Sequence, residues 1–458
     1  MVSKRPRDNP SGAGGANQRG VLRRVLTNAG VLLSGRVVEG LLGLPTMALA
    51  VRTLGMEGFG SLSLIVAFAA IIGHLANVKL GTTILTFGAP RLEAGDSEGL
   101  RRLIAFAVRI ELVATLAAVG VGYLLAMTLG PWFGWPASIS GLGAAYMLVI
   151  AFQTRGRVAN GTLRLFRRFD LIAITRTSQT LTQLLGTSAL WLTETDSLAA
   201  FLAVWFAAAV IRGVGLVSGG YHELRKRTIW PLGLKAPPRG RDIHAQLWRF
   251  IGIHNINSLT ALPSSQLGTL LIGASLGAAD TGLFQIGSRL AQNTAHPIRA
   301  LRPAIGPEVA QMLAGSALYR LRRLLGRAMG IAALISVSCL ALLVLFGGPL
   351  LQLLGGHEAT AAYAVMLLTA TATLMGATSF PFPVLLNAAA KPGWITVSKL
   401  ANTIVYLMSF FALAPTLGVN AAGAAAIAAV LTRRSIEGSG AWRLLQHLPS
   451  ITSRHAAS

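Results

Sequence analysis

The sequence predicts an all-α polytopic membrane protein with about 12 transmembrane helices, in two six-helix bundles related by pseudo-two-fold symmetry about the membrane normal. Hydrophobic residues make up 53% of the 458 residues and charged residues only 12%, against about 25% charged residues in soluble domains. A chain with this composition and a mean hydropathy of +0.60 cannot cover a water-facing surface. Apolar runs of about 18 to 25 residues recur along it, each long enough to cross a hydrocarbon layer of about 30 Å as a helix.

Twelve such runs follow one another, and polar residues interrupt the first, second, fifth and eighth. An even number of crossings puts both termini on the same side of the membrane. We expect the spans at residues 26–50, 59–79, 103–129, 137–153, 170–191, 197–218, 249–273, 282–305, 327–352, 362–387, 393–415 and 419–440.

The connections between the spans alternate in charge, with most Lys and Arg residues on one side. By the positive-inside rule, the basic connections and both termini are cytoplasmic. The formal net charge of +24 therefore does not indicate a nucleic-acid partner, since the basic residues form no compact basic domain. The basic segments are residues 4–24, 91–102, 155–168, 225–241, 320–327 and the tail from 433.

An internal repeat groups the spans into two halves. Leu54-Gly55 with Gly60 matches Leu276-Gly277 with Gly282, at a shift of 222 residues (54 to 276). The same shift places His74 on His296. Because six is an even number, equivalent spans run in the same direction and the symmetry axis lies along the membrane normal. The expected organisation is a cytoplasmic tail (1–25), a first bundle (26–218), a cytoplasmic linker (219–248), a second bundle (249–440) and a cytoplasmic tail (441–458).

Span 8 carries a polar stripe that is costly in lipid. Arg289, Gln292, Asn293, His296 and Arg299 fall on one side of the helix, at 100° per residue. A central Arg costs about 2.5–3.5 kcal/mol, whereas each Leu, Ile or Phe returns only about 0.3–0.6 kcal/mol. We therefore expect the stripe to line a water-filled cavity. The alternatives are an amphipathic helix on the cytoplasmic surface and a buried structural network.

Other spans also contain polar and basic residues. Arg36 and Glu39 are three residues apart in span 1, where they either form a local ion pair or take part in the transport path. The remaining candidates are basic residues in spans 5, 6 and 11 (Arg176, Arg212 and Lys399) and polar residues in spans 2 and 7 (His74, His254 and Asn257). Together these residues make the interior cationic, which predicts an anionic substrate. Arg suits phosphate oxygens especially well.

Sequence signatures of catalysis and cofactor binding are absent. The chain has no Gly-rich nucleotide-binding loop, no zincin helix and no credible nucleophile elbow. The single Cys339 excludes a disulfide framework and a cysteine-based metal site. We expect no enzyme activity, no metal and no cofactor.

Four short motifs suggest a family. They are Leu54 to Gly60 (LGMEGFG), Gly161 to Asp170 (GTLRLFRRFD), Leu276 to Phe284 (LGAADTGLF) and Leu417 to Ala425 (LGVNAAGAA). With these motifs the chain resembles the polysaccharide-transporter family of bacterial lipid-linked oligosaccharide flippases. That family lies in the MOP exporter superfamily, which also contains the multidrug and toxic-compound exporters.

The resemblance implies a V-shaped pair of bundles in the bacterial inner membrane. By alternating access, the pair would move an undecaprenyl-diphosphate-linked sugar to the outer leaflet for lipopolysaccharide, capsule or exopolysaccharide. Membrane lipid would be a further partner, with a polysaccharide polymerase and a chain-length regulator as candidates. Membrane potential alone would drive the cycle, with proton coupling through Glu39, His74 or His296 as the alternative. A multidrug or metabolite cation antiporter is the first alternative function, and a non-transporting membrane scaffold or polysaccharide polymerase is the second. Members of this family often carry an acidic residue in span 7. This chain has Gly268 at about that place, which argues against a cation site in span 7.

Overall fold

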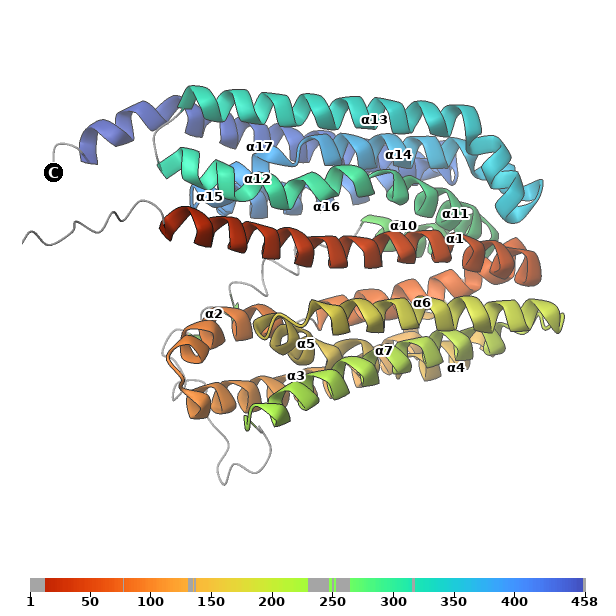
Figure 1. Ribbon diagram of the computed structural model, residues 1–458. Coiled ribbons are helices and arrows are strands. Elements are labelled where there is room, and N and C mark those ends of the chain that lie inside the picture. Colours follow the sequence, from red (N-terminus) through yellow and green to blue (C-terminus); the bar gives the residue numbers. More distant parts are fainter. Residues whose placement is uncertain are drawn as a thin grey trace, which may run out of the picture.

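A computed structural model describes residues 13–76, 78–130, 135, 137–229, 247–248, 251–252, 264–314 and 318–455. Every secondary-structure element in these residues is a helix, as the sequence predicts. Two layers of roughly parallel helices lie one above the other in Figure 1, the amino-terminal layer ending with α7 and the carboxy-terminal layer beginning with α10.

The first layer, the N-lobe, contains seven described helices. They are α1 (Ala13–Leu75), α2 (Leu80–Glu93), α3 (Ser97–Leu129), α4 (Ala137–Tyr146), α5 (Val149–Leu165), α6 (Phe169–Leu192) and α7 (Leu198–Lys226). Helix α1 contains two spans, because its two segments meet at a kink at Gly55. Helix α2 continues the second of these spans, and α4 and α5 together form the fourth.

The second layer, the C-lobe, repeats this arrangement. Its described helices are α10 (Ser264–Leu276), α11 (Ala278–Thr294), α12 (His296–Ala314), α13 (Leu318–Gly355), η2 (Glu358–Ala362), α14 (Tyr363–Thr378), α15 (Pro381–Ala388), α16 (Gly393–Leu417) and α17 (Asn420–His455). Span 8 consists of α11 and α12, and span 10 of η2, α14 and α15.

Each of the twelve predicted spans coincides with helix in the described residues. Among the residues that the structure describes, six stretches are long and apolar enough to cross a membrane by length and composition alone. The other spans are shorter or more polar because several of them line internal cavities. The six stretches are Glu39–Glu93, Ser97–Leu129, Leu198–Lys226, Tyr319–Gly355, Glu358–Ala388 and Gly393–Leu417.

The helices extend further than predicted at the basic end of the molecule. Helix α1 begins at Ala13, inside the expected tail, and α17 continues to His455, through most of the other tail. Residues 155–165, expected in a basic connection, form the second half of α5. The helices are longer than the predicted spans because hydropathy marks the hydrocarbon layer, whereas a helix continues beyond it wherever caps are available. Asp96 is such a cap, since its Oδ1 accepts a 2.8 Å hydrogen bond from the backbone N–H of Gly99.

The basic motif before α6 fastens the connection between α5 and α7. Arg168 forms an ion pair with Asp170 at 2.9 Å and a second one with the buried Glu223 of α7. The motif from Gly161 to Asp170 therefore has a structural role, because its ion pairs hold this connection against α7.

The internal repeat is visible in the backbone. Gly55 has φ 70° and Gly277 has φ 95°, a conformation that favours glycine. Each of these residues turns the chain between two neighbouring spans. The two glycines that the repeat aligns thus occupy equivalent corners of the two lobes.

The lobes touch next to these corners, at a contact that we call the glycine seam: Gly60 against Ala278, and Gly282 against Met56. A Cβ atom added at Gly60 would overlap the carbonyl oxygen of Ala278, and one added at Gly282 would overlap the carbonyl oxygen of Met56. The two contacts are reciprocal, because a shift of 222 residues turns one into the other. Close by, Arg52 donates a 2.6 Å hydrogen bond to the carbonyl oxygen of Leu353 across the lobes. The lobes are therefore closed against each other at the corner end.

Candidate functional site

A cavity of about 350 Å3 lies between the lobes. Helix α11 and the start of α12 supply most of its wall, and α1 and α6 supply the rest. We call it the inter-lobe cavity. Its lining residues are Glu39, Gly40, Arg176, Arg289, Gln292, Asn293, His296 and Arg299. The structure thus brings the whole predicted stripe of span 8 to one cavity, together with two polar residues of the other lobe.

Two glycines of α1 make room for the stripe. A Cβ atom built on Gly43 would lie 3.6 Å from Nη2 of Arg289, and one built on Gly40 would lie 3.9 Å from Oδ1 of Asn293. The polar face of α11 therefore lies over a face of α1 that has no side chains at these positions. A larger residue at either position would take up space that the stripe now borders.

Charge in the inter-lobe cavity is predominantly positive. Its lining holds three arginines against one carboxylate, Glu39, which lies 3.6 Å from Arg176 (Oε2 to Nη1). Asn293 and His296 form a 3.3 Å hydrogen bond, and Gln292 donates to Ser288 at 3.0 Å. Glu39 thus contacts the fifth span, an ion pair that the sequence could not assign. Arg36 is on α1, but its side chain lies outside the described residues.

A second cavity, of about 290 Å3, lies inside the N-lobe. Arg212 lines it and donates a 3.0 Å hydrogen bond to Oε1 of Gln179. Lys79, Arg157 and Arg164 are also in its wall.

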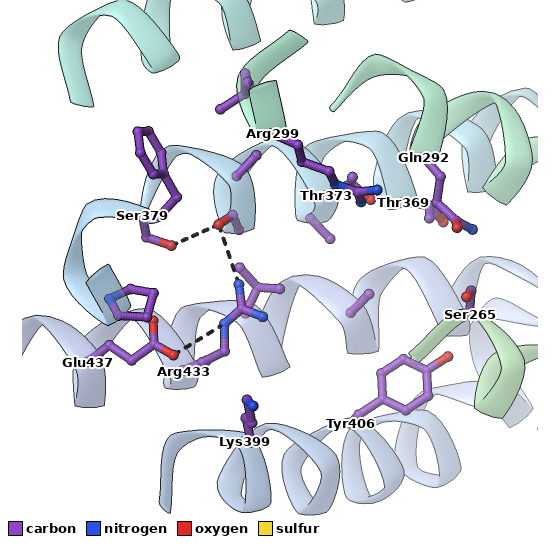
Figure 2. Close-up of a pocket in the computed structure, with 18 of the residues that line it drawn as sticks. Ser265, Gln292, Arg299, Thr369, Thr373, Ser379, Lys399, Tyr406, Arg433 and Glu437 are labelled. Atoms are coloured by element: carbon purple, nitrogen blue, oxygen red, sulfur yellow. Dashed lines mark hydrogen bonds and ion pairs between the residues drawn. The ribbon is translucent and has the colours of Figure 1, made fainter. Parts of the chain in front are cut away.

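The largest of these cavities, about 610 Å3, lies inside the C-lobe. Figure 2 shows Arg299 on one side of this C-lobe cavity and Lys399 on the other, with Arg433 between them. Nε of Arg433 is 4.0 Å from Oε1 of Glu437. Gln292 and Arg299 line both this cavity and the inter-lobe cavity. The structure therefore places Lys399 deeper in the C-lobe than the stripe of span 8.

Two arginines were not predicted as site residues. Arg433 was counted with the basic carboxy-terminal residues although it falls inside the predicted span 419–440, and Arg157 was assigned to a connection. Arg157 donates hydrogen bonds to the carbonyl oxygens of Gly73 (2.6 Å) and Ala76 (3.0 Å), where α1 ends and span 2 is broken. The buried Glu111 accepts hydrogen bonds from the backbone N–H groups of Arg157 (3.0 Å) and Val158 (2.9 Å). The signal that points to Arg157 is the break in span 2, because carbonyl groups freed inside a membrane protein need hydrogen-bond donors.

The remaining candidates stand apart. His74 is half-buried at the end of α1 and lines none of the three cavities described above. His254 and Asn257 lie outside the described residues. Gly268 has no room for a side chain, since an added Cβ atom would lie 2.6 Å from the hydroxyl of Tyr406. An acid at this place would displace the ring of Tyr406.

Taken together, the cavities suit an anion better than a cation. Guanidinium and amide groups line the cavity between the two lobes, and Glu39 is the one carboxylate among the described lining residues. In the part of the chain that the structure describes, no group of three metal-ligating side chains is found.

Comparison with known proteins finds a family and a relative with similar sequences. The sequence profile of a family described as polysaccharide biosynthesis protein matches residues 25–297. The inner membrane protein YghQ of Escherichia coli (strain K12) is 26% identical over 306 residues, which cover 64% of this chain and 82% of YghQ.

Solved structures of transporters share the fold. An inward-facing multidrug resistance MATE family transporter of the MOP superfamily superposes with a TM-score of 0.77 at 15% identity, covering 92% of this chain and 99% of that one. A MOP superfamily transporter from Pyrococcus furiosus, described as having a binding pocket of reverse polarity, gives a TM-score of 0.63 at 15% identity, with 93% and 96% covered. These likenesses establish the two-lobed fold.

Proposed function

The chain belongs to the polysaccharide biosynthesis protein family, and on this premise we propose that it is a flippase for an undecaprenyl-diphosphate-linked oligosaccharide in the bacterial inner membrane. Two findings support the proposal. The fold is that of a membrane protein with internal cavities, and the family is described by polysaccharide biosynthesis. The relative YghQ is itself an inner membrane protein, which supports the location.

The observation that carries the proposal is the charge of the inter-lobe cavity. Three arginines face one glutamate there, and uncompensated positive charge at membrane depth is costly unless an anion occupies the site. Arginine binds phosphate oxygens through two parallel hydrogen bonds. A diphosphate would therefore bind between the lobes, while its prenyl tail remains in lipid.

The direction of transport follows from the orientation that the basic residues predict. The corner end, with its closed glycine seam, would face outward, and the basic end would face the cytoplasm. The cavity would then receive substrate from the inner leaflet. Each negative charge moved outward gains about 2.3 kcal/mol per 100 mV of membrane potential, so the potential favours export and the return of the empty cationic cavity.

A cation antiporter of the same superfamily fits the cavity poorly. Glu39, the carboxylate in the described lining, lies within ion-pair distance of Arg176, and three guanidinium groups would repel a cationic drug. Catalysis is not part of the proposal, because flipping requires only that the cost of moving the head group through hydrocarbon be lowered.

We expect purified protein in proteoliposomes to transfer a fluorescent prenyl-diphosphate sugar between leaflets, detected by the loss of quenching from one side. A potassium diffusion potential that is negative on the starting side should accelerate transfer, because about 2.3 kcal/mol per charge per 100 mV favours the movement. Protein-free liposomes and a potential of opposite sign are the controls. Transfer no faster than in protein-free liposomes would reject the proposal.

Glu39→Gln tests whether this carboxylate couples transport to protons. Its ion pair with Arg176 is half exposed, and loss of such a pair changes stability by about 0–1 kcal/mol. If the membrane potential drives the cycle, we expect the variant to transport at close to the normal rate, with the same dependence on potential and none on a pH gradient. Loss of a pH-gradient response that the unaltered protein shows would instead identify Glu39 as the coupling residue.

A further inference from the structure

We propose that the C-lobe cavity binds the saccharide part of the substrate, and that this saccharide carries an anionic substituent of its own. The inference rests on the proposed function, because it takes the diphosphate to lie in the inter-lobe cavity. It adds a second subsite and a chemical class of sugar.

Position favours the C-lobe cavity as the second subsite. Gln292 and Arg299 belong to its wall and to that of the inter-lobe cavity, so a head group attached to a bound diphosphate reaches it without crossing a separate wall. The N-lobe cavity shares no lining residue with the inter-lobe cavity. There, moreover, Arg157 and Arg212 are engaged with backbone carbonyls and with Gln179.

Size and polarity suit a short oligosaccharide. The volume of about 610 Å3 lies in the range of about 300–1,000 Å3 typical of small-molecule sites. Hydroxyl and amide groups line it alongside aromatic rings, including Ser265, Thr373, Asn387 and Phe380. Such a mixture matches sugars, which present hydroxyl groups at the rim and C–H groups on the faces of the ring.

Two hydroxyl groups in the wall of the C-lobe cavity lack a hydrogen-bond partner in the described structure. In the described structure, the hydroxyls of Thr369 and Tyr406 are buried and make no hydrogen bond, although buried polar groups nearly always make one. Figure 2 shows both residues at the same end of the cavity, next to Ser265 and Gln292. Hydroxyls of a bound sugar are groups that can satisfy them.

Charge indicates that the saccharide is acidic. Arg299, Lys399 and Arg433 line the cavity together with one carboxylate, that of Glu437. Glu437 accepts a 3.0 Å hydrogen bond from Ser398 and lies beside Arg433. Arg299 also lines the inter-lobe cavity, so Lys399 and Arg433 are the basic residues that belong to the C-lobe cavity alone. Two basic side chains against one carboxylate in the described lining suit an anionic substituent better than a neutral sugar.

A matched pair of ligands tests the inference. The probes are two undecaprenyl-diphosphate-linked trisaccharides that differ only in carrying either glucuronic acid or glucose at one position. Binding to the full-length protein in nanodiscs is measured by titration. We expect the acidic probe to bind about tenfold tighter or more, which is the effect of one added charge-assisted contact.

Variants separate the two subsites. Lys399→Gln should bring the affinity for the acidic probe down to that for the neutral one, and Lys399→Arg should keep the preference. Lys391→Gln, which removes an exposed lysine outside the cavities, should change nothing. Arg289→Gln should weaken binding of both probes by similar factors.

Two results would overturn the inference while leaving the proposed function intact: equal binding of both probes, or a preference that Lys399→Gln leaves unchanged. Failure of both probes to bind would count against the proposed function as well. A thermal unfolding curve for each variant shows that the comparison concerns folded protein.

Discussion

Replacing Arg289 or Arg299 by alanine is expected to abolish surface polysaccharide while the protein still reaches the membrane. Both side chains line the inter-lobe cavity, and a hydrogen bond to a charged group is worth about 1.5–3 kcal/mol. Removal of one such contact lowers affinity for the diphosphate roughly 10- to 100-fold, and the double substitution should remove binding. The measurement is the amount of surface polymer in cells that lack the chromosomal gene and express each variant.

Arg323→Ala is the matched control for these substitutions. Arg323 is exposed on α13 and lines none of the cavities, so its loss removes the same charge from the chain without changing the site. Immunoblots of membrane fractions give the amount of each variant. Normal polymer from the stably expressed double variant would refute the role of the stripe.

Gly282→Ala is expected to stop transport by a different route, through the glycine seam. The added methyl group would overlap the carbonyl oxygen of Met56, a backbone atom that cannot rotate away. Overpacking of this kind costs about 1–3 kcal/mol, which reduces the population of the closed seam roughly 5- to 150-fold. The substitution should therefore favour a state that is open at the corner end, and Gly60→Ala should do the same from the other lobe.

Spin labels on Glu57 and Ala279 report this change directly. Both side chains are exposed beside the seam, and the repeat makes them equivalent positions of the two lobes. In a background in which Cys339 is replaced by serine, the label distance should lengthen in Gly282→Ala. Gly120→Ala is the control, because Gly120 is exposed on α3 and an added Cβ atom there meets nothing within 4 Å. An unchanged distance together with normal transport would show that the seam tolerates the methyl group.

The architecture was predictable because the bilayer imposes a length and a hydropathy on each span. Twelve spans, two halves and the family were inferred from the apolar runs, from the glycine pairs at 55 and 277, and from four motifs; the family match over residues 25–297 confirms the assignment. The direction of the span 8 stripe followed from its spacing, because 100° per residue fixes which side chains share a face.

Contacts between distant spans were beyond the reach of the sequence. Glu39 had a neighbour at Arg36, yet the described structure places it against Arg176 of α6, since tertiary packing decides which helix faces which. Arg157 and Arg433 looked like ordinary basic residues of connections, because hydropathy does not show how far a helix runs beyond the lipid. The folded chain places Arg157 at the break in span 2 and Arg433 in the wall of the C-lobe cavity.

The reciprocity of the glycine seam contrasts with the unequal chemistry of the cavities. Gly60 and Gly282 make equivalent contacts in the two halves. The cavity residues Arg289, Lys399 and Arg433 instead lie in the C-terminal half. In the proposed function, rocking would use the duplicated parts, and substrate selection would use cavity residues that differ between the halves. Exchange of cavity residues would then change the sugar that is bound without altering the glycine seam.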